Sequence, residues 1–336
     1  KTRHTYDNNI IVSFRLLRSF QPAKSARLLG RGVFTPGMNS DSRRTWLEVA
    51  LNGPWTRKRQ PRIPVTVSDI VEEGVACVKA GAAIVHVHAY DEATGRQTES
   101  PDVYVRIIEG IRSQVDAIVY PTIPTTGLEG QAGGLSPERR FAHVEELARL
   151  GLIEWMAIDP GSVNFSLYDD LREDRPGFVY LNSEQEIRNG LALARRYALH
   201  PSYAIYEPGF ARLGATLHWR ESCPAPVYRF MFSSGYTFSF PPEDYGLTAY
   251  LKLLDQVAPG AQWMVAGLQV DVMPLIARAV AEGGHVRVGL EDAVHGCGLS
   301  NVQLVEQAAK IILTCGGELA TAPEVRADLT PEEQIA

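Results

Sequence analysis

Cysteine is scarce in this chain of 336 residues, which also lacks long apolar runs and an excess of positive charge. The four cysteines form no C-x-x-C pair and are too few for a disulfide scaffold, which favours a reducing, cytoplasmic location. No apolar stretch reaches the roughly 18 to 20 residues that a membrane span needs. The formal net charge of −6 argues against a nucleic-acid-binding protein. With 45% hydrophobic residues, the composition is that of a globular protein.

Acidic residues are nearly absent from the first 44 positions, which hold nine Lys or Arg residues against two acids. A basic, acid-poor leader can be a transit peptide, although Arg15 and Arg18 interrupt the apolar core that a secretory signal requires. The alternatives are a poorly ordered tail or an upstream extension, with the working protein beginning near Met38. We therefore predict a basic N-terminal extension over residues 1–44, on which none of the chemistry below depends.

From Trp46 onward, short apolar runs alternate with longer amphipathic segments, a pattern typical of repeated strand–helix units. Eight such units are the number in a closed (β/α)₈ or TIM barrel. The rival fold, a doubly wound open sheet, usually has a G-x-G-x-x-G turn after its first strand, and residues 51–54 form none. We predict one barrel domain over residues 45–322 and a tail over residues 323–336. The expected strands are 46–51, 84–89, 117–123, 154–159, 202–206, 227–232, 262–268 and 285–290.

Two histidines end the second predicted strand. His86 and His88 are two residues apart, so their side chains project from the same face and can share one metal ion. In a barrel, functional side chains gather at the C-terminal ends of the strands, where this pair lies. Two unrelated polar residues are the alternative.

The last predicted strand offers a third ligand. Arg287 and Glu291 share a face, and closure of the barrel brings this strand within two strands of the histidines. Two histidines and a glutamate with an open fourth position form the ligand set of a catalytic zinc site, although manganese, iron or cobalt could occupy it. Alternatively, Glu291 pairs structurally with Arg287. Asp292 follows Glu291 and is a candidate general base, its pKa lowered by Arg287.

Loops rich in oxygen and glycine follow the third, fourth and fifth predicted strands. Their hydroxyl groups and free backbone N–H groups suit a carboxylate or phosphate, whereas ordinary turn chemistry selects the same residue types. The candidate substrate-binding residues in these loops are Thr122, Thr125, Gly161, Ser162 and Glu207.

At residues 86–88 and 284–292 the sequence resembles the β-keto acid cleavage enzyme family, which includes the 3-keto-5-aminohexanoate cleavage enzymes. The likeness runs from about residue 46 to residue 322. Matches keep their order along this whole region, which makes the resemblance more specific than H-x-H alone. They include Asn52-Gly53, Pro61–Thr66, Ala80–Ala83, Gly161–Phe165, Trp263–Gly267 and Ser300–Val305.

The resemblance implies a homotetrameric TIM barrel with zinc bound at His86, His88 and Glu291. It also implies that a β-keto acid reacts with acetyl-CoA, the co-substrate, to give acetoacetate and a new acyl-CoA. In the family's mechanism Arg287 and Asp292 would promote deprotonation of the zinc-bound keto acid. The nucleophile attacks the thioester, CoA migrates, and a retro-Claisen step releases acetoacetate, with the developing enolate charge stabilised by zinc.

The sequence departs from the characterised family pattern on its fifth strand. Ala204 stands where those members carry a Glu that faces the site, and Pro54-Trp55 replaces a Glu near the end of the first strand. A cationic keto acid is therefore disfavoured, and Trp55, Tyr120 and Tyr206 indicate a more apolar pocket. Glu207 would supply a carboxylate from a neighbouring position.

Three other functions fit the metal ligands. A hydrolase of the amidohydrolase type also uses H-x-H in a barrel, but it places this motif on the first strand and adds histidines on later strands, whereas residues 203–206 and 227–232 contain none. A metal-dependent aldolase or lyase would act without CoA, so a requirement for acetyl-CoA separates it from the leading hypothesis. A non-catalytic metal-binding barrel would consume no keto acid.

Overall fold

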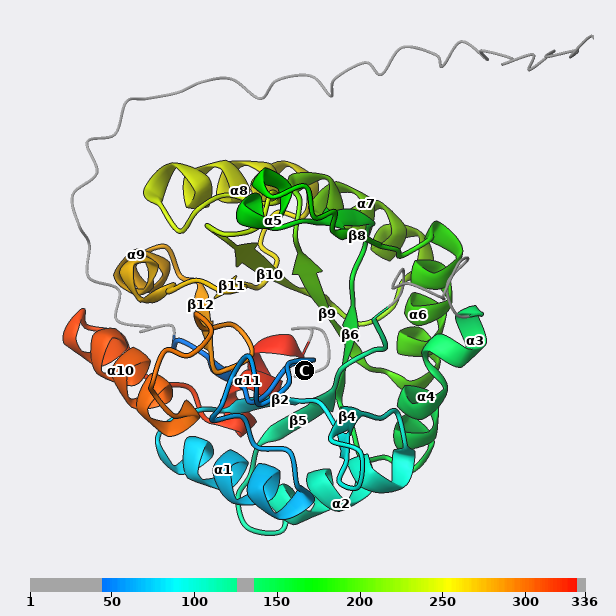
Figure 1. Ribbon diagram of the computed structural model, residues 1–336. Coiled ribbons are helices and arrows are strands. Elements are labelled where there is room, and N and C mark those ends of the chain that lie inside the picture. The colour runs from blue at the N-terminus through cyan, green and yellow to red at the C-terminus, as the bar shows by residue number, and fades with distance from the viewer. Residues whose placement is uncertain (1–43, 126–135, 331–336) are drawn as a thin grey trace, which may run out of the picture. The chain divides into compact units, whose positions relative to one another are not determined.

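Eight parallel strands form one sheet that is nearly closed into a barrel (Figure 1). The computed structural model describes residues 44–125 and 136–330, so the predicted N-terminal extension, apart from Arg44, lies outside the described residues. The hydrogen-bonded order is β5-β2-β1-β12-β11-β10-β9-β6, with β5 and β6 side by side. This architecture confirms the predicted (β/α)₈ barrel. The strands are β1 (Leu47–Ala50), β2 (Ile84–Val87), β5 (Ile118–Pro121), β6 (Trp155–Ile158), β9 (His200–Ile205), β10 (Val227–Phe232), β11 (Trp263–Gly267) and β12 (His285–Val288).

A ring of helices surrounds the strands and buries their outward-facing apolar side chains (Figure 1). Several helices begin at residues that cap free backbone N–H groups. Ser183 and Ser300 form capping boxes with Glu186 and Gln303, which satisfy donors that the first turn leaves unpaired. The main helices are α1 (Val67–Lys79), α2 (Pro101–Arg112), α4 (Ala142–Arg149), α6 (Glu184–Tyr197), α7 (Pro208–Glu221), α8 (Asp244–Val257), α9 (Ile276–Ala281) and α10 (Asn301–Thr314).

Short elements extend several connections between the barrel strands. A hairpin of β3 (Tyr90–Asp91) and β4 (Arg96–Gln97) follows β2, and a second hairpin of β7 (Val163–Phe165) and β8 (Phe178–Tyr180) follows β6. Both hairpins place side chains around the C-terminal mouth of the barrel, where the functional residues lie. The remaining elements are α3 (Pro137–Arg140), α5 (Tyr168–Arg172) and the 3₁₀ helix η1 (Met273–Leu275).

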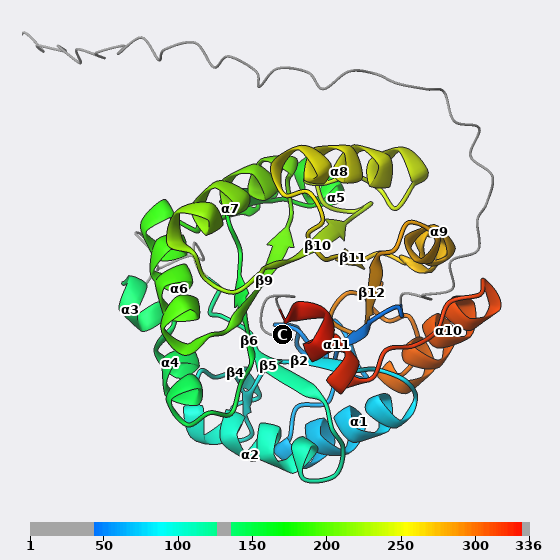
Figure 2. The same ribbon diagram turned by 180° about the vertical axis from the view of Figure 1, so that it is seen from behind.

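Helix α11 (Ala322–Leu329) lies across the opposite, N-terminal end of the barrel, in front of the strands in Figure 2. Nε1 of Trp46 donates a hydrogen bond of 2.7 Å to Asp328 on this helix. Arg326 makes an ion pair with Glu154, at the entrance to β6. The segment predicted as a C-terminal tail from residue 323 thus contains a helix that is tied to the barrel. In the part of the chain that the structure describes, no helix is long and apolar enough to cross a membrane.

Candidate metal centre and active-site cavity

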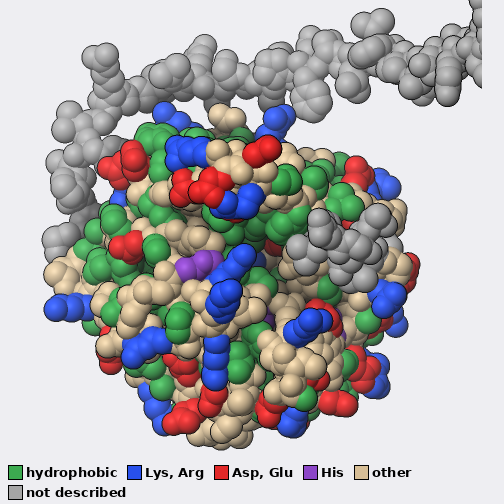
Figure 3. All heavy atoms as spheres, viewed as in Figure 1, with side chains coloured by type: hydrophobic (Ala, Val, Ile, Leu, Met, Phe, Trp, Pro, Cys, Tyr) green, Lys and Arg blue, Asp and Glu red, His purple; other side chains and the backbone are tan. Residues whose placement is uncertain are grey.

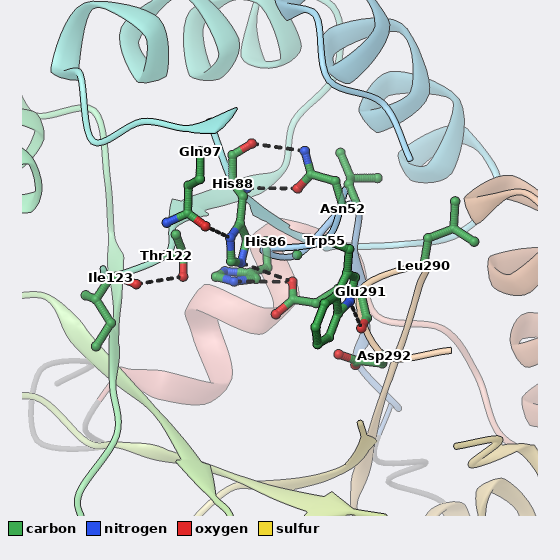
Figure 4. Close-up of polar contacts among 12 residues, drawn as sticks. Asn52, Trp55, His86, His88, Gln97, Thr122, Ile123, Leu290, Glu291 and Asp292 are labelled. Carbon is green, nitrogen blue, oxygen red and sulfur yellow. Dashed lines mark hydrogen bonds and ion pairs between the residues drawn. The ribbon is translucent and has the colours of Figure 1, made fainter. Parts of the chain in front are cut away.

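His86, His88 and Glu291 meet at the C-terminal mouth of the barrel (Figure 4). His86 belongs to β2, His88 follows its last residue, and Glu291 lies in the connection after β12. Strand β1 separates β2 from β12, as the sequence analysis expected. Nε2 of each histidine lies 3.5 Å from Oε2 of Glu291. The three predicted ligands therefore converge on one point.

The charge state and burial of these three side chains fit a bound zinc ion. Ligand atoms that each lie about 2.0 to 2.1 Å from a tetrahedral zinc are about 3.3 Å apart, close to the separation here. Both His88 Nε2 and Glu291 Oε2 are buried with no hydrogen-bond partner among the described residues. Burial lowers the pKa of His86, which keeps it neutral, as a metal ligand must be. Burial opposes ionisation of Glu291, but Arg287 and the histidines hold its pKa well below its usual value.

Polar groups from separate segments fix the orientation of His88. The side chain of Asn52 accepts a hydrogen bond from the His88 backbone N–H at 2.9 Å and donates one to the His88 carbonyl at 3.0 Å. Gln97, on β4, places Oε1 2.8 Å from His88 Nδ1. Nδ1 then carries the proton and leaves Nε2 free to bind a metal, which is the usual role of such a partner.

Glu291 is positioned by close contacts with the loop after β1. Nε1 of Trp55 donates a hydrogen bond of 2.7 Å to the Glu291 carbonyl (Figure 4). Gly53 has φ +62°, and a Cβ added there would lie 2.6 Å from Cγ of Glu291. Only glycine adopts this backbone conformation readily and leaves room for the glutamate. Asn52 thus holds the backbone of His88, and the adjacent Gly53 leaves room for the side chain of Glu291.

Arg287 lies below the ligands and binds three carboxylates. Its Nη1 is 3.1 Å from Glu48, its Nη2 is 3.0 Å from Glu291, and its Nε and Nη2 each donate a 2.8 Å hydrogen bond to Asp292. Tyr120 donates a further hydrogen bond to Glu48 at 2.7 Å. Burial raises the pKa of Asp292 to about 6, although Arg287 opposes the increase. Arg287 therefore couples the predicted base to the metal ligands.

Arg287 lies on the wall of a cavity of about 150 Å³ that the three candidate ligands also line, whereas Asp292 is buried and does not line this cavity. Figure 3 shows the side of the molecule with the mouth, where histidine atoms are visible next to a row of Lys and Arg side chains. The wall combines the three candidate ligands with Ala204, Arg229 and Asp159, and six of its other members are aromatic. These aromatic residues are Trp55, Phe165, Phe178, Tyr180, Tyr206 and Tyr236.

The predicted substrate contacts divide into two groups. Thr122 and Thr125 line the cavity. Gly161, Ser162 and Glu207 do not line it. Ser162 and Gly161 instead bind Asn182, because Ser162 Oγ donates to the Asn182 carbonyl and the Gly161 carbonyl accepts from Asn182 Nδ2. Glu207 immediately precedes α7, and its side chain makes no cap hydrogen bond.

Several residues of the site were not identified from the sequence. Asn52 and Gln97 contact His88 only because folding brings separate segments together, so their sequence positions do not reveal this role. Glu48 and Arg229 could have been identified from the sequence, because each is a charged residue inside an otherwise apolar strand. Glu48 lies in β1 and Arg229 in β10. A charge in a buried strand requires a partner or a function.

A family model named beta-keto acid cleavage enzyme matches residues 44–330. The chain belongs to this family. It is 30% identical over 287 residues to the 3-oxoadipate:acetyl-CoA acetyltransferase of Cupriavidus necator, which covers 84% of this chain and 93% of that protein. It is 27% identical to the 3-keto-5-aminohexanoate cleavage enzyme of Fusobacterium nucleatum, over 81% of this chain and 92% of that protein. The resemblance found from the sequence is confirmed, and with it the expectation of an enzyme.

A solved structure titled "Apo structure of ObcA" shares the fold. It aligns with a TM-score of 0.63 at 17% identity, over 80% of this chain and 65% of the solved chain.

Proposed function

We propose that this member of the family is a zinc-dependent enzyme that transfers the acyl part of a β-keto acid to CoA. The keto acid R–CO–CH₂–COO⁻ and acetyl-CoA give acetoacetate and R–CO–S-CoA. The C2–C3 bond of the keto acid and the bond between the acetyl group and the sulfur of acetyl-CoA break. The CH₂–COO⁻ unit joins the acetyl group, and the R–CO group joins the CoA sulfur. All atoms are conserved, and no oxidant or reductant is required.

The observation that carries this proposal is the convergence of His86, His88 and Glu291 beside Arg287 on one cavity wall. A zinc ion held there acts as a Lewis acid on a substrate carbonyl and stabilises negative charge on oxygen. The named activities of the two relatives, an acetyl-CoA acetyltransferase and a keto acid cleavage enzyme, support the same reaction class.

The Arg287–Asp292 pair promotes removal of the C2 proton. Arg287 faces the cavity, and both oxygens of Asp292, which lies behind it, accept its hydrogen bonds. The C2 proton therefore reaches Asp292 through Arg287: the guanidinium gives one of its protons to Asp292 as it takes up the C2 proton. The pKa of Asp292, about 6, is closer to neutrality than that of an ordinary aspartate, as suits a general base. The positive charge of Arg287 then stabilises the enolate that forms next to it.

The aromatic cavity wall would limit the access of water to the reacting carbons. The aromatic rings of Phe165, Tyr206 and Tyr236 line the cavity and contact one another, with ring centroids 5.3 Å apart for Phe165 with each tyrosine. Exclusion of water favours transfer of the acyl group to CoA over its hydrolysis. It also strengthens the electrostatic effect of Arg287.

The test incubates the zinc-loaded full chain with a panel of β-keto acids, with and without acetyl-CoA, and measures acetoacetate and new acyl-CoA. We expect both products in equal amounts, only when acetyl-CoA is present. Turnover without acetyl-CoA would favour an aldolase or lyase, and no turnover of any keto acid would refute the proposal. A variant with His86→Ala and His88→Ala serves as the control without a metal site. The tetramer implied by the resemblance stays a prediction, which sedimentation analysis tests.

A further inference from the structure

Arg229 is a buried arginine on the cavity wall that the proposed reaction does not use. It lies in the middle of β10, faces into the barrel and is 3% exposed. Strand β10 pairs with β9 so that Arg229 is in register with Ala204, which also lines the cavity. The two side chains therefore lie next to each other on the wall.

The guanidinium of Arg229 lacks an acidic partner. Its Nη2 donates a hydrogen bond of 3.2 Å to the Ser202 carbonyl, and its Nε is buried without a hydrogen-bond partner. Among residues 44–125 and 136–330, no carboxylate lies within 4.0 Å of it. Arg287, buried to a similar degree, has three carboxylates at such distances. Of the two buried arginines on the cavity wall, Arg287 therefore pairs with carboxylates, whereas Arg229 has no carboxylate within ion-pair distance.

Glu48 and Asp159 attract the positive charge of Arg229, but neither forms an ion pair with it within 4.0 Å. Oδ2 of Asp159 accepts a hydrogen bond from Tyr180, and burial raises the pKa of Asp159. Ala204 has only a methyl group and leaves the space beside Arg229 open to the cavity. An unpaired buried charge is costly, whereas a guanidinium binds a carboxylate through two parallel hydrogen bonds. The position next to Arg229 therefore favours the binding of an anion.

We propose that Arg229 binds a second, terminal carboxylate of the substrate, so that the preferred substrate is a dicarboxylic β-keto acid. This inference rests on the proposed function. The carboxylate common to all β-keto acids lies next to the carbon that reacts and belongs at the ligand end of the cavity, near Arg287. The aromatic walls of the cavity contact the methylene chain that joins the two ends. A cationic end group would instead meet the uncompensated charge of Arg229.

The test measures binding of two keto acids of equal chain length to the zinc-loaded protein without acetyl-CoA. 3-Oxoadipate has a terminal carboxylate, and 3-oxohexanoate has a methyl group in its place. Calorimetry is expected to give a dissociation constant on the order of 100-fold lower for 3-oxoadipate, as for a carboxylate hydrogen-bonded to a buried charge. Arg229→Gln is expected to reduce this preference to less than about fivefold. Arg220→Gln, an exposed change on α7, is the matched control.

A second variant pair tests the same site from the neighbouring strand. Ala204→Glu places a carboxylate beside Arg229 and should weaken 3-oxoadipate binding much more than Ala204→Gln, which has similar size and no charge. Thermal unfolding of each variant separates loss of folding from loss of the anion site.

Four results would overturn the inference. The first is that the native protein binds the two acids with equal affinity, and the second is that Arg229→Gln weakens the binding of both acids equally. The third is that Ala204→Glu and Ala204→Gln have equal effects on 3-oxoadipate binding. The fourth is that the preference for 3-oxoadipate is lost in Arg59→Gln and kept in Arg229→Gln. Equal weakening by Arg229→Gln would mean that Arg229 binds the carboxylate common to both acids. Arg59 is the exposed arginine on the cavity wall. Addition of acetyl-CoA tests the reaction separately, because absence of acetoacetate with the binding preference intact would refute only the proposed function.

Discussion

Gln97 and His88 form a hydrogen bond of 2.8 Å between Oε1 and Nδ1, although they belong to opposite ends of a small hairpin connection. Nε2 of Gln97 donates to Glu99, which turns its Oε1 towards the histidine. Nδ1 of His88 must then carry the proton, and Nε2 faces Glu291 as a free acceptor. One glutamine thus sets the tautomer of a proposed metal ligand.

Replacement of Gln97 should weaken zinc binding without removing a ligand. We expect Gln97→Ala to raise the dissociation constant for zinc by about 10- to 100-fold, the usual effect of losing such a partner. Competition with a chromophoric chelator measures this constant. Gln97→Glu keeps an acceptor and should retain tight binding. Equal affinity of the native protein and Gln97→Ala would show that the hydrogen bond does not orient the ligand.

A methyl group at Gly53 should disturb the third ligand. In Gly53→Ala the new Cβ would lie 2.6 Å from Cγ of Glu291 and would also require φ +62°. We expect a loss of about 1 to 3 kcal/mol in the free energy of unfolding and weaker zinc binding. Gly260→Ala is a suitable control, because this glycine also has positive φ but its Cβ would meet no atom within 4 Å. If the two variants bind zinc equally well, Gly53 is not needed for the position of Glu291.

Asp292→Asn should remove catalysis and keep the metal. Asparagine retains the size of the side chain and one acceptor for Arg287, but it cannot hold the C2 proton. We expect kcat to fall by about 10²- to 10⁴-fold, with an unchanged zinc content by elemental analysis. Asp255→Asn, on α8 and exposed, should behave as the native protein. A decrease of less than threefold in Asp292→Asn would exclude Asp292 as the base.

The protein should lose stability as the pH falls below about 6.5, in part because of His143. Its Nε2 lies 2.8 Å from the Thr122 carbonyl, and its buried Nδ1 has no partner for a second proton. Burial lowers the pKa of His143, so below about pH 6.5 the unfolded chain binds a proton that the folded chain does not. This residue should reduce the free energy of unfolding by up to about 1.4 kcal/mol per pH unit there.

Urea unfolding of the native protein and of His143→Gln between pH 5 and pH 8 measures this contribution. Glutamine can donate to the Thr122 carbonyl but does not titrate, so the variant should have a shallower pH dependence. Parallel curves for the two proteins would contradict the assignment.

The barrel and the convergence of the three candidate ligands were predictable because they depend on local patterns. Each strand is a short apolar run, and His86 in β2 and His88 just after it are two residues apart in extended chain, which places both side chains on one face. Glu291 required only the closure of the barrel. The connections were less predictable, because α11 and the β3–β4 hairpin are defined by contacts with distant segments such as the hydrogen bond of Trp46 to Asp328.

The supporting residues of the site could not be assigned from the sequence for the same reason. Asn52 reaches the backbone of His88 from 36 positions away, and Trp55 reaches the carbonyl of Glu291 from 236 positions away. Neither has a spacing pattern that predicts its partner. Arg229 was missed although its charge interrupts an apolar strand, which is a local signal.

The most direct test of the proposed reaction follows the two acetyl carbons of labelled acetyl-CoA. The zinc-loaded protein is incubated with a β-keto acid and acetyl-CoA that carries ¹³C in both acetyl carbons, and the products are analysed by NMR. We expect the label only at C3 and C4 of acetoacetate, with an unlabelled acyl group on the new acyl-CoA. Label in the new acyl-CoA, or its retention in acetyl-CoA while the keto acid is consumed, would contradict the account.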